Sequence, residues 1–296
     1  MQFIKDPNNP IYGDAQTGTL FDVYVTKGDE KRLRMDLSTR ADGCVSVAYS
    51  ADGIRWSAPQ TALQPDPASG WEELVNRNCV LRVGGTYKMW YTGQAHGNSY
   101  IGYAESADGI HFIRVGSEPV LAPESPWEGE SVMNPCVLLE NGMYRMWYSA
   151  GETFEPNVLC YAESADGVHW NKSPLNPIFE RNPAKAYEQD RIGGCQILPH
   201  KTLGYLLFYI GYRDVHTACI CCARSQDGVT DFRRCRQNPL VAPDKGTWDG
   251  DSCYKPSALY DADANRWRIW YNGRACSKEY IGTAAADGDF TINDFE

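Results

Sequence analysis

A block with the pattern Ser-x-Asp-Gly-x-x-aromatic recurs along the chain, and this repeat constrains the fold more than any other feature of the sequence. Three copies are complete, the fourth is longer by one residue, and the fifth is degenerate. The aspartates of the five copies are Asp52, Asp108, Asp166, Asp227 and Asp287, and they lie 56, 58, 61 and 60 residues apart. Five units of about 60 residues therefore fill the 296-residue chain.

Each unit has the pattern of four strands. An Asp-Gly pair between two β-rich runs is typical of a hairpin, because glycine accepts a positive φ at no steric cost. An aromatic strand such as 87–93 lies upstream of the pair, and a strand of small apolar residues such as 79–83 precedes it. No helical period of useful length is present. The repeat predicts an all-β fold, a five-bladed β-propeller with four antiparallel strands per blade. Two β-sandwiches are the alternative, but they do not explain equal repeats.

We expect a single domain over residues 1–296. The expected blades are approximately 11–64, 65–122, 123–181, 182–242, and 243–296 together with 1–10. The interval from Phe3 to Pro10 equals that from Trp170 to Pro177, so the N-terminus resembles an outer strand without the rest of its blade. It would complete the last blade and close the ring, although the C-terminal segment 290–296 competes for the same place.

Charge and composition narrow the class of protein. The chain has 28 Lys and Arg against 38 Asp and Glu, a formal charge of −10, and no basic run, which argues against a nucleic-acid partner. No stretch approaches about 18 consecutive apolar residues, so no membrane span is expected. The N-terminus lacks a basic and then apolar leader pattern, which favours a cytoplasmic location. The sequence leaves the oligomeric state open.

The eleven cysteines are expected to be reduced core residues. The cluster 219–222 lacks the spacing of a zinc site, so neither a metal nor another cofactor is expected. Clustered oxygens at the axis would nevertheless suit a structural Ca²⁺ ion.

In a propeller the innermost strand of each blade lines the axis, so its residues are the first candidates for a site. We aligned these strands on Val25, Val80, Val137, Ile197 and Ala258. Seven residues earlier, four blades carry a carboxylate: Glu73, Glu130, Asp190 and Asp251. An aromatic residue, such as Trp127 or Trp248, stands two or three residues before each of them. These carboxylates either cap backbone N–H groups between blades or form an acidic ring at the mouth of the axis.

A second aligned position, three residues before the anchor, differs in every blade: Asp22, Arg77, Asn134, Gly194 and Lys255. Repetition is expected of architecture, whereas departures from the repeat are expected of a site. Loops between the second and third strands reach the same face and supply Arg40, Gln94, His96, Glu152, Arg213 and Arg274. Neighbouring polar or aromatic residues complete the expected substrate-binding set: Asn76, Arg191, Tyr254, Trp127 and Trp248. Such a rim suits hydroxyl-rich or anionic ligands.

These motifs resemble a known superfamily over nearly the whole chain. The Trp-Tyr-x-Gly strands, the Ser-x-Asp-Gly-x-x-Trp hairpins and the run 127–135 resemble the five-bladed glycoside hydrolases, which include arabinanases, levansucrases, invertases and mannoside phosphorylases (families 43, 68, 32 and 130). The resemblance implies that Asp22, at the start of the first inner strand, is the nucleophile or base. Those families carry an aspartate in the second blade, where this chain has Asn-Arg-Asn at 76–78. They place the general-acid glutamate of the third blade close before a Pro or Cys, whereas Glu130 lies five residues before Pro135. The segment 188–191 matches the Glu-Asp-Pro-Arg signature of the phosphorylases only in part.

Glycoside hydrolysis requires two carboxyl groups on either side of the scissile bond. We therefore expect a glycosidase acting on a small oligosaccharide or a terminal bond. Asp22 would be base or nucleophile, Glu130 or Asp190 the general acid, and Asp251 or Glu73 an auxiliary carboxylate. One alternative is a phosphorylase in which Arg77, Arg191, Arg213, Arg274 and Lys255 hold phosphate. Another is a non-catalytic propeller that binds glycans or proteins.

Overall fold

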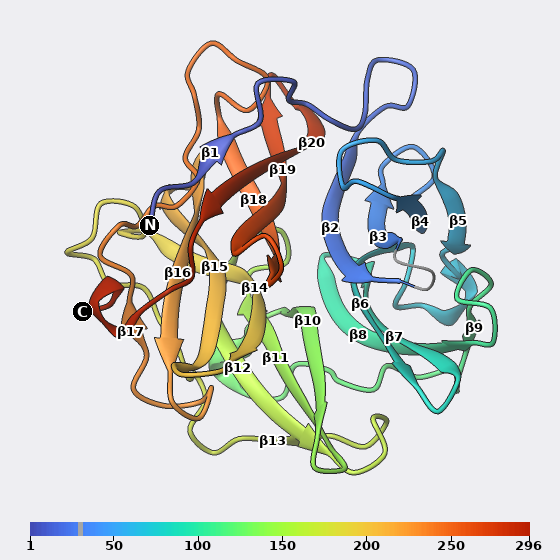
Figure 1. The fold of residues 1–296 in the computed structure, drawn as a ribbon. Helices are drawn as coiled ribbons and strands as arrows, with labels where there is room; N and C mark the ends of the chain where they lie inside the picture. The colour runs from blue at the N-terminus through green and yellow to red at the C-terminus, as the bar shows by residue number, and fades with distance from the viewer. Residues whose placement is uncertain (29–31) are drawn as a thin grey trace.

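The computed structural model describes residues 1–28 and 32–296, and the described chain is built of β-strands with three short 3₁₀ helices (Figure 1). The strands fall into five antiparallel groups of four, which we call units 1 to 5. Unit 1 is β2 (Leu20–Lys27), β3 (Leu33–Thr39), β4 (Cys44–Ser50) and β5 (Gln60–Leu63). Unit 2 is β6 (Leu74–Val83), β7 (Thr86–Ala95), β8 (Asn98–Ser106) and β9 (Ile113–Arg114).

Unit 3 is β10 (Ser131–Glu140), β11 (Met143–Gly151), β12 (Pro156–Ser164) and β13 (Asn171–Lys172). Unit 4 is β14 (Arg191–His200), β15 (Gly204–Asp214), β16 (Thr217–Ser225) and β17 (Arg233–Arg234). Unit 5 is β18 (Ser252–Asp261), β19 (Arg266–Ala275), β20 (Lys278–Asp287) and β1 (Ile4–Lys5). Units 2 and 3 are joined into one sheet by a parallel pair between Ser99 and Ser131. The 3₁₀ helices are η2 (Pro67–Ser69), η3 (Pro126–Glu128) and η4 (Ile292–Asp294).

The repeated Ser-x-Asp-Gly block forms hairpins that are structural. In the first copy, Asp52 Oδ1 accepts the backbone N–H groups of Ile54 and Arg55, both at 2.8 Å. Ser50 Oγ accepts the N–H of Gly53 at 2.8 Å, and Gly53 has a φ of 76°, which explains the invariant position of glycine in the block. The same contacts recur at 106–111, 164–169 and 225–230.

Buried tryptophans connect three of the hairpins to a neighbouring unit. The indole Nε1 of Trp90 donates to the carbonyl of Gly167 at 2.8 Å, and that of Trp147 donates to the carbonyl of Gly228 at 2.6 Å. The indole of Trp270 in unit 5 donates to the carbonyl of Gly53 in unit 1 at 2.8 Å. The contact between units 5 and 1 is therefore of the same kind as those between units 2 and 3 and between units 3 and 4.

A second repeated contact pairs a buried carboxylate with a cation on the outer strand. The carboxylates are Glu72, Glu128, Glu188 and Asp249, all fully buried. Their partners are Arg114, Lys172, Arg234 and Lys5, at 2.5, 2.8, 2.5 and 2.7 Å. Each carboxylate directly follows an aromatic residue, Trp71, Trp127, Tyr187 or Trp248. These repeated acids therefore have a structural role. They lie one or two residues before the carboxylates aligned in the sequence analysis, which are Glu73, Glu130, Asp190 and Asp251.

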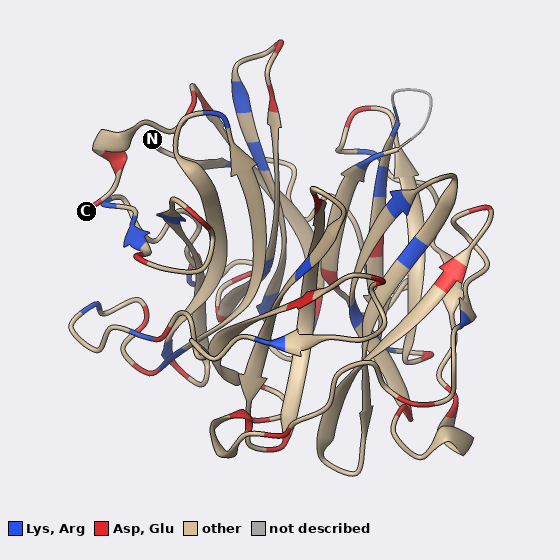
Figure 2. Cartoon of the chain, turned by 90° about the horizontal axis from the view of Figure 1, so that it is seen from below, with Lys and Arg blue, Asp and Glu red and all other residues tan. Residues whose placement is uncertain are grey.

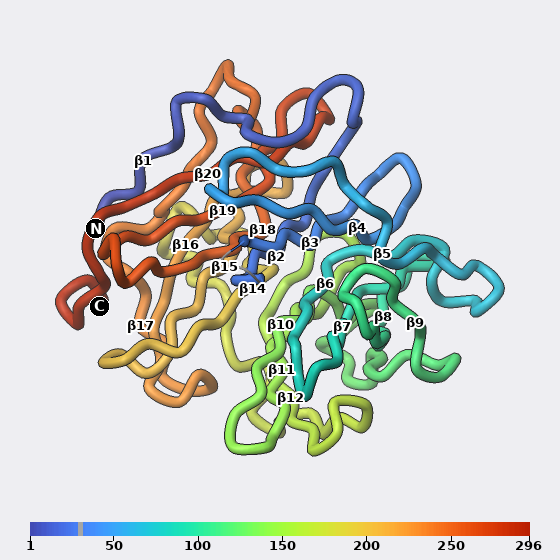
Figure 3. Tube along the Cα trace, turned by 45° about the vertical axis from the view of Figure 1, so that its right-hand side comes forward, coloured from blue at the N-terminus to red at the C-terminus, as the bar shows by residue number. Residues whose placement is uncertain are grey.

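The N-terminal strand completes unit 5. β1 pairs antiparallel with β20 through Ile4 and Ala285, and in Figure 3 the blue β1 runs beside the red β20. Lys5 thereby occupies the outer-strand position that Arg114, Lys172 and Arg234 occupy in units 2, 3 and 4. The C-terminal segment lies instead against β17, where the N–H of Glu296 donates to the carbonyl of Arg234 at 3.0 Å.

The core lies between the sheets and includes ten of the eleven cysteines, all free, whereas Cys276 is exposed. Acidic and basic residues are interspersed along the strands and loops (Figure 2). No helix among the described residues is long and apolar enough to cross a membrane.

Substitution of Lys5 tests the place of β1. Lys5→Met should lower the free energy of unfolding by about 3 kcal/mol, because the Asp249 carboxylate, 1% exposed, loses its cation. Urea unfolding followed by tryptophan fluorescence measures the change. The control is Lys201→Met, which removes an exposed lysine 3.4 Å from Asp289 and should cost less than about 1 kcal/mol. Equal effects of the two variants would contradict the structural role of Lys5.

Candidate functional site

The innermost strand of every unit bends at the same position. The register shifts between Phe21 and Tyr24 in β2, and corresponding shifts occur in β6, β10, β14 and β18. The residues at these bulges have left-handed φ angles: Asp22 55°, Arg77 48°, Asn134 55°, Gly194 39° and Lys255 44°. Non-glycine residues rarely adopt such angles, so their recurrence marks a constructed feature of the fold.

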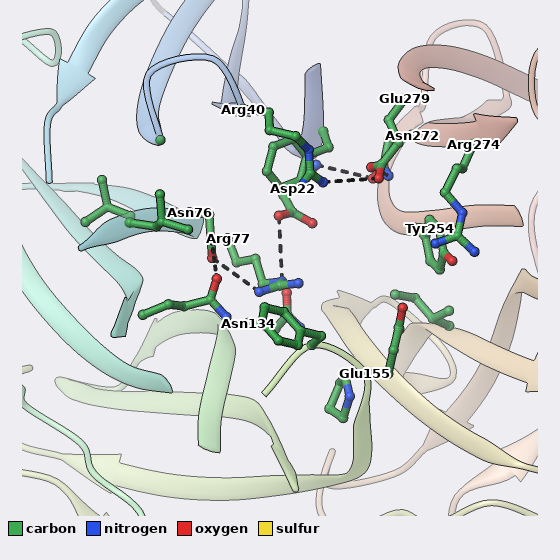
Figure 4. Close-up of a pocket in the computed structure, with 18 of the residues that line it drawn as sticks. Asp22, Arg40, Asn76, Arg77, Asn134, Glu155, Tyr254, Asn272, Arg274 and Glu279 are labelled. Carbon is green, nitrogen blue, oxygen red and sulfur yellow. Dashed lines mark hydrogen bonds and ion pairs between the residues drawn. The ribbon is translucent and has the colours of Figure 1, made fainter. Parts of the chain in front are cut away.

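Side chains of the adjacent unit hold these bulges in place. The N–H of Asp22 donates to Asn272 Oδ1 at 3.2 Å, and the N–H of Asn134 donates to Thr92 Oγ1 at 3.1 Å. Ser38 and Ser149 accept in the same way from Arg77 and Gly194, at 3.2 and 2.9 Å. The bulges thereby turn variable residues out of the strand ladder, and Asp22, Arg77 and Asn134 line a common pocket (Figure 4).

This axial pocket has a volume of about 290 Å³. Eight residues that the sequence analysis selected line it: Asp22, Arg40, Asn76, Arg77, Gln94, Asn134, Tyr254 and Arg274. Further polar or aromatic lining residues were not selected: Phe154, Glu155, Tyr212, Asn272 and Glu279. The pocket thus combines three carboxyl groups with three guanidinium groups.

Asp22 has a buried carboxylate oxygen that lacks a hydrogen-bond donor among the described residues. The residue is 6% exposed, and its Oδ2 accepts no hydrogen bond from the described residues. Arg77 lies nearby, with its Nε 3.6 Å from Oδ2, an ion pair longer than a hydrogen bond. A buried oxygen without a donor is uncommon in folded proteins and is typical of a group kept for a ligand or a reaction.

Glu279, at the start of β20, lines the pocket beside Arg40 and Asn272 and lies near Asp22 (Figure 4). Its Oε1 lies 3.3 Å from Arg40 Nη2, and its Oε2 accepts from Asn272 Nδ2 at 3.0 Å. Burial raises the pKa of Glu279, and the negative charge of Asp22 raises it further, while Arg40 acts in the opposite direction.

Glu155 lies in the loop between β11 and β12. Burial raises the pKa of its carboxyl group, and this effect is only partly offset by the Tyr212 hydroxyl and by Arg77. Two neighbouring units clamp the loop: Gln94 Nε2 donates to the carbonyl of Thr153 at 3.2 Å, and Arg191 Nη1 donates to the carbonyl of Glu155 at 2.9 Å.

Arg191 also pairs with Glu152 at 2.9 Å. These two residues were expected to bind substrate, but they lie outside the pocket lining and hold the loop that carries Glu155. A network of this kind fixes the direction of a side chain without contacting the ligand.

The four carboxylates at the aligned position do not form an acidic ring in the pocket. Glu73, Glu130 and Asp251 are exposed and Asp190 is half-exposed, and none of them lines the pocket. Glu73 lies 3.7 Å from His96, and Asp190 pairs with Arg191 at 2.7 Å. The physical reason is that the buried acids just upstream anchor each connection, so the aligned acids point to solvent.

The remaining predicted residues also lie elsewhere. Trp127 and Trp248 pack against the core, Lys255 is buried at 2% exposure, and His96 is exposed. Arg213 lines a separate concavity. Among the described residues, no group of three or more His, Cys, Asp or Glu side chains is arranged to hold a metal ion.

Glu155 and Glu279 were missed for different reasons. Glu155 lies in one of the loops that the sequence predicted to face the axis, but Glu152 was selected from it. Glu279 begins a third strand, for which no sequence pattern indicated an axial position.

Comparison with known proteins gives this geometry a context. Residues 46–176 match the family model for the glycosyl hydrolases family 32 N-terminal domain. The chain is 28% identical over 283 residues to an uncharacterized protein of Mycobacterium tuberculosis, covering 91% of this chain and 89% of that protein. It is also 29% identical over 150 residues to a 1,2-beta-oligomannan phosphorylase of Thermoanaerobacter, covering 47% of this chain and 50% of that protein.

Solved structures share the fold along nearly the whole chain. A thermostable family-43 glycoside hydrolase has a TM-score of 0.76 at 17% identity, covering 97% of this chain and 94% of that one. A beta-1,2-mannobiose phosphorylase from Listeria innocua has a TM-score of 0.72 at 14% identity, covering 97% of both chains. The chain therefore shares its fold with a family-43 glycoside hydrolase and a mannoside phosphorylase, and the family-32 match over residues 46–176 supports the resemblance that its motifs indicated.

The raised pKa of Glu279 predicts a pH-dependent stability. A raised carboxyl pKa contributes stability that is fully present below the pKa of the unfolded chain and is lost as the pH rises through the folded value. Glu279→Gln should therefore become more stable relative to the wild type as the pH rises from 4 to 8. Urea unfolding across this range measures the difference.

The exposed Glu118→Gln variant is the control and should show no such trend. A Glu279→Gln difference that stays constant, or that declines with rising pH, would contradict the assignment.

Proposed function

We propose that this protein cleaves a terminal glycosidic bond, or a bond of a small oligosaccharide, by acid–base catalysis in the axial pocket. The observation that carries the proposal is the convergence of Asp22, Glu155 and Glu279 on one pocket of about 290 Å³. Glycoside cleavage needs one carboxyl that gives a proton and one that attacks the sugar or activates water. A pocket of this volume suits one or two sugar rings.

Glu155 is the proposed general acid. Its raised pKa favours the protonated form, which an acid must hold near neutral pH. The proton of its carboxyl group is transferred to the glycosidic oxygen as the bond from that oxygen to the sugar breaks. The clamp through Arg191 and Gln94 keeps the carboxyl directed at the pocket.

Asp22 is the proposed base or nucleophile. Its Oδ2 accepts no hydrogen bond from the described residues, so a lone pair can take a proton from water or attack the anomeric carbon. Arg77 restricts its orientation from 3.6 Å. Glu279 lies near Asp22, and in its ionised form its carboxylate would stabilise the positive charge that develops on the sugar ring.

The other lining residues suit a hydroxyl-rich ligand. Asn134 Oδ1 and the Tyr254 hydroxyl are buried without a hydrogen-bond partner among the described residues, and sugar hydroxyls would satisfy them. Phe154 is 69% exposed at the edge of the pocket and offers a flat face for a sugar ring. No cofactor enters this proposal.

We also propose that residues 1–296 form one five-bladed ring closed between units 5 and 1. Three contacts support this closure. Trp270 Nε1 donates to the carbonyl of Gly53, Asp22 N–H donates to Asn272, and the N–H of Val25 donates to Ser257 Oγ at 2.8 Å. Asp22 and Asn272 both line the axial pocket, and Val25 lies three residues further along β2, the strand that carries Asp22. Closure of the ring and the geometry of the site therefore depend on each other.

The role of Glu155 as general acid is tested by comparing the effect of Glu155→Gln on two substrates whose leaving groups differ in their need for a proton. A nitrophenyl glycoside screen first identifies the sugar. The variant should then cleave an oligosaccharide of that sugar about 10² to 10⁴ times more slowly in kcat, because the alcohol leaving group needs a proton. A 2,4-dinitrophenyl glycoside of the same sugar should be affected by less than about tenfold, since its leaving group departs without protonation.

Glu118→Gln, on an exposed loop, provides the matched control and should retain wild-type rates. Equal losses on both substrates would exclude Glu155 as the acid. Full activity on both would exclude it from the reaction.

A phosphorylase is the second candidate. Arg40, Arg77 and Arg274 line the pocket and suit a phosphate ion that replaces water as the attacking group. The similarity to the Thermoanaerobacter phosphorylase favours this alternative, although it spans only half of that protein.

Buffer exchange separates the two reactions. Hydrolysis predicts the same rate in phosphate-free and phosphate buffers and a free sugar as product. Phosphorolysis predicts no turnover without phosphate and a sugar 1-phosphate as product, which ³¹P NMR detects directly. This second result would overturn the hydrolase in favour of the phosphorylase.

A further inference from the structure

A second concavity lies between units 4 and 5, beside the axial pocket. Its volume is about 850 Å³, and residues of both units line it. Arg274 lines this concavity and the axial pocket, so the two share a wall. Nothing in the proposed reaction uses the second concavity, which is large enough for a further part of a bound molecule.

Positive charge dominates the lining. Arg213, Lys245 and Arg274 face the concavity together with a single carboxylate, Asp251. Asp251 Oδ2 is engaged by the backbone N–H of Cys276 at 2.9 Å. This concentration of cations contrasts with the net charge of −10 of the chain. A concave surface of one sign attracts ligands of the opposite sign.

Two of these cations retain unused donors. Arg213 is paired with Asp214, whose Oδ2 lies 3.2 Å from its Nε, whereas neither Lys245 nor Arg274 forms an ion pair within 4.0 Å in the described part of the chain. The Arg274 guanidinium stacks 5.1 Å from the centre of the Tyr254 ring and gives one long hydrogen bond, 3.3 Å, to the carbonyl of His216. A guanidinium held in this way presents its remaining N–H groups in a fixed direction, which suits the oxygens of a phosphate or carboxylate.

The rest of the wall is suited to a sugar ring. Tyr187, half-buried, lies in the lining with Pro239 and Pro243. Flat apolar surfaces next to charged donors are typical of sites that bind a saccharide by its ring face and its charged substituent.

We propose that this concavity binds an anionic group, a phosphate or a carboxylate, carried by the saccharide whose bond is cleaved in the axial pocket. The identification of the carrier as that saccharide rests on the proposed function. The anionic group would contact Arg213, Lys245 and Arg274, and the adjoining sugar ring would lie against Tyr187. The substrate class is therefore an acidic or phosphorylated oligosaccharide.

Calorimetry on the full chain in 50 mM NaCl tests this assignment with four probes: glucose, glucose 6-phosphate, glucuronate and inorganic phosphate. At least one sugar anion should bind about tenfold more tightly than both glucose and inorganic phosphate. Whichever of the two sugar anions binds more tightly identifies the group. The affinity should decline in 300 mM NaCl, because screening weakens exposed charge pairs.

The double variant R213Q/K245Q localises the binding. It should lower the affinity for the sugar anion by about tenfold. The control Lys201→Gln, which removes an exposed cation outside the concavity, should leave that affinity unchanged. Unchanged urea unfolding of the double variant verifies its fold. Sugar anions that bind no more tightly than glucose, or that are insensitive to R213Q/K245Q, would overturn the proposal. Inorganic phosphate binding as tightly as the sugar anion would also overturn it, in favour of a free-ion site.

These measurements involve no turnover. Failure of the binding test would leave the assignment of Glu155 standing, and failure of the leaving-group test would leave the anion site standing.

Discussion

The hydrogen bond from an inner-strand bulge to the adjacent unit is the interaction on which the site depends. A left-handed backbone at a non-glycine residue costs about 1–2 kcal/mol, so the bulges persist only because their surroundings hold them. Asn272 holds the bulge at Asp22, and Thr92 holds the one at Asn134. Each contact crosses from one unit to the next, so the direction of a pocket side chain and the packing of the units are determined together.

The same architecture separates two kinds of carboxylate. Glu128 and Glu188 are fully buried, follow an aromatic residue and pair with a cation of the outer strand. These ion pairs fix the connection that leads to the inner strand. Asp22 occupies a repeated bulge position at which every unit carries a different residue, Glu155 lies in a loop outside the repeat, and both line the pocket. Repetition therefore marks the acids that build the fold, and departure from it marks the acids available for chemistry.

Much of this could be predicted from the sequence. The repeat predicted the strands and hairpins, and the position three residues before each anchor predicted Asp22 and Arg77 in the pocket, because the bulge obeys the repeat. Glu155 could not be placed in this way, since a loop clamped by Arg191 and Gln94 directs it. Glu130 was expected in the pocket because it lies seven residues before the inner-strand anchor Val137. The connection before each inner strand is irregular, so a shift of one or two residues there changes a side chain from buried to exposed, and Glu130 is exposed.

The central claim is that Asp22 and Glu155 act as one pair across the pocket. The most direct test is the pH dependence of kcat/KM for the wild type and for Glu155→Gln, both on a 4-nitrophenyl glycoside of the preferred sugar, whose leaving group is still assisted by protonation but departs at a measurable rate without it. The account predicts a bell-shaped wild-type profile and a variant profile in which activity no longer falls on the alkaline side, because no acid remains to lose its proton. A variant that retains the alkaline limb would contradict the assignment, because another group would then be the acid.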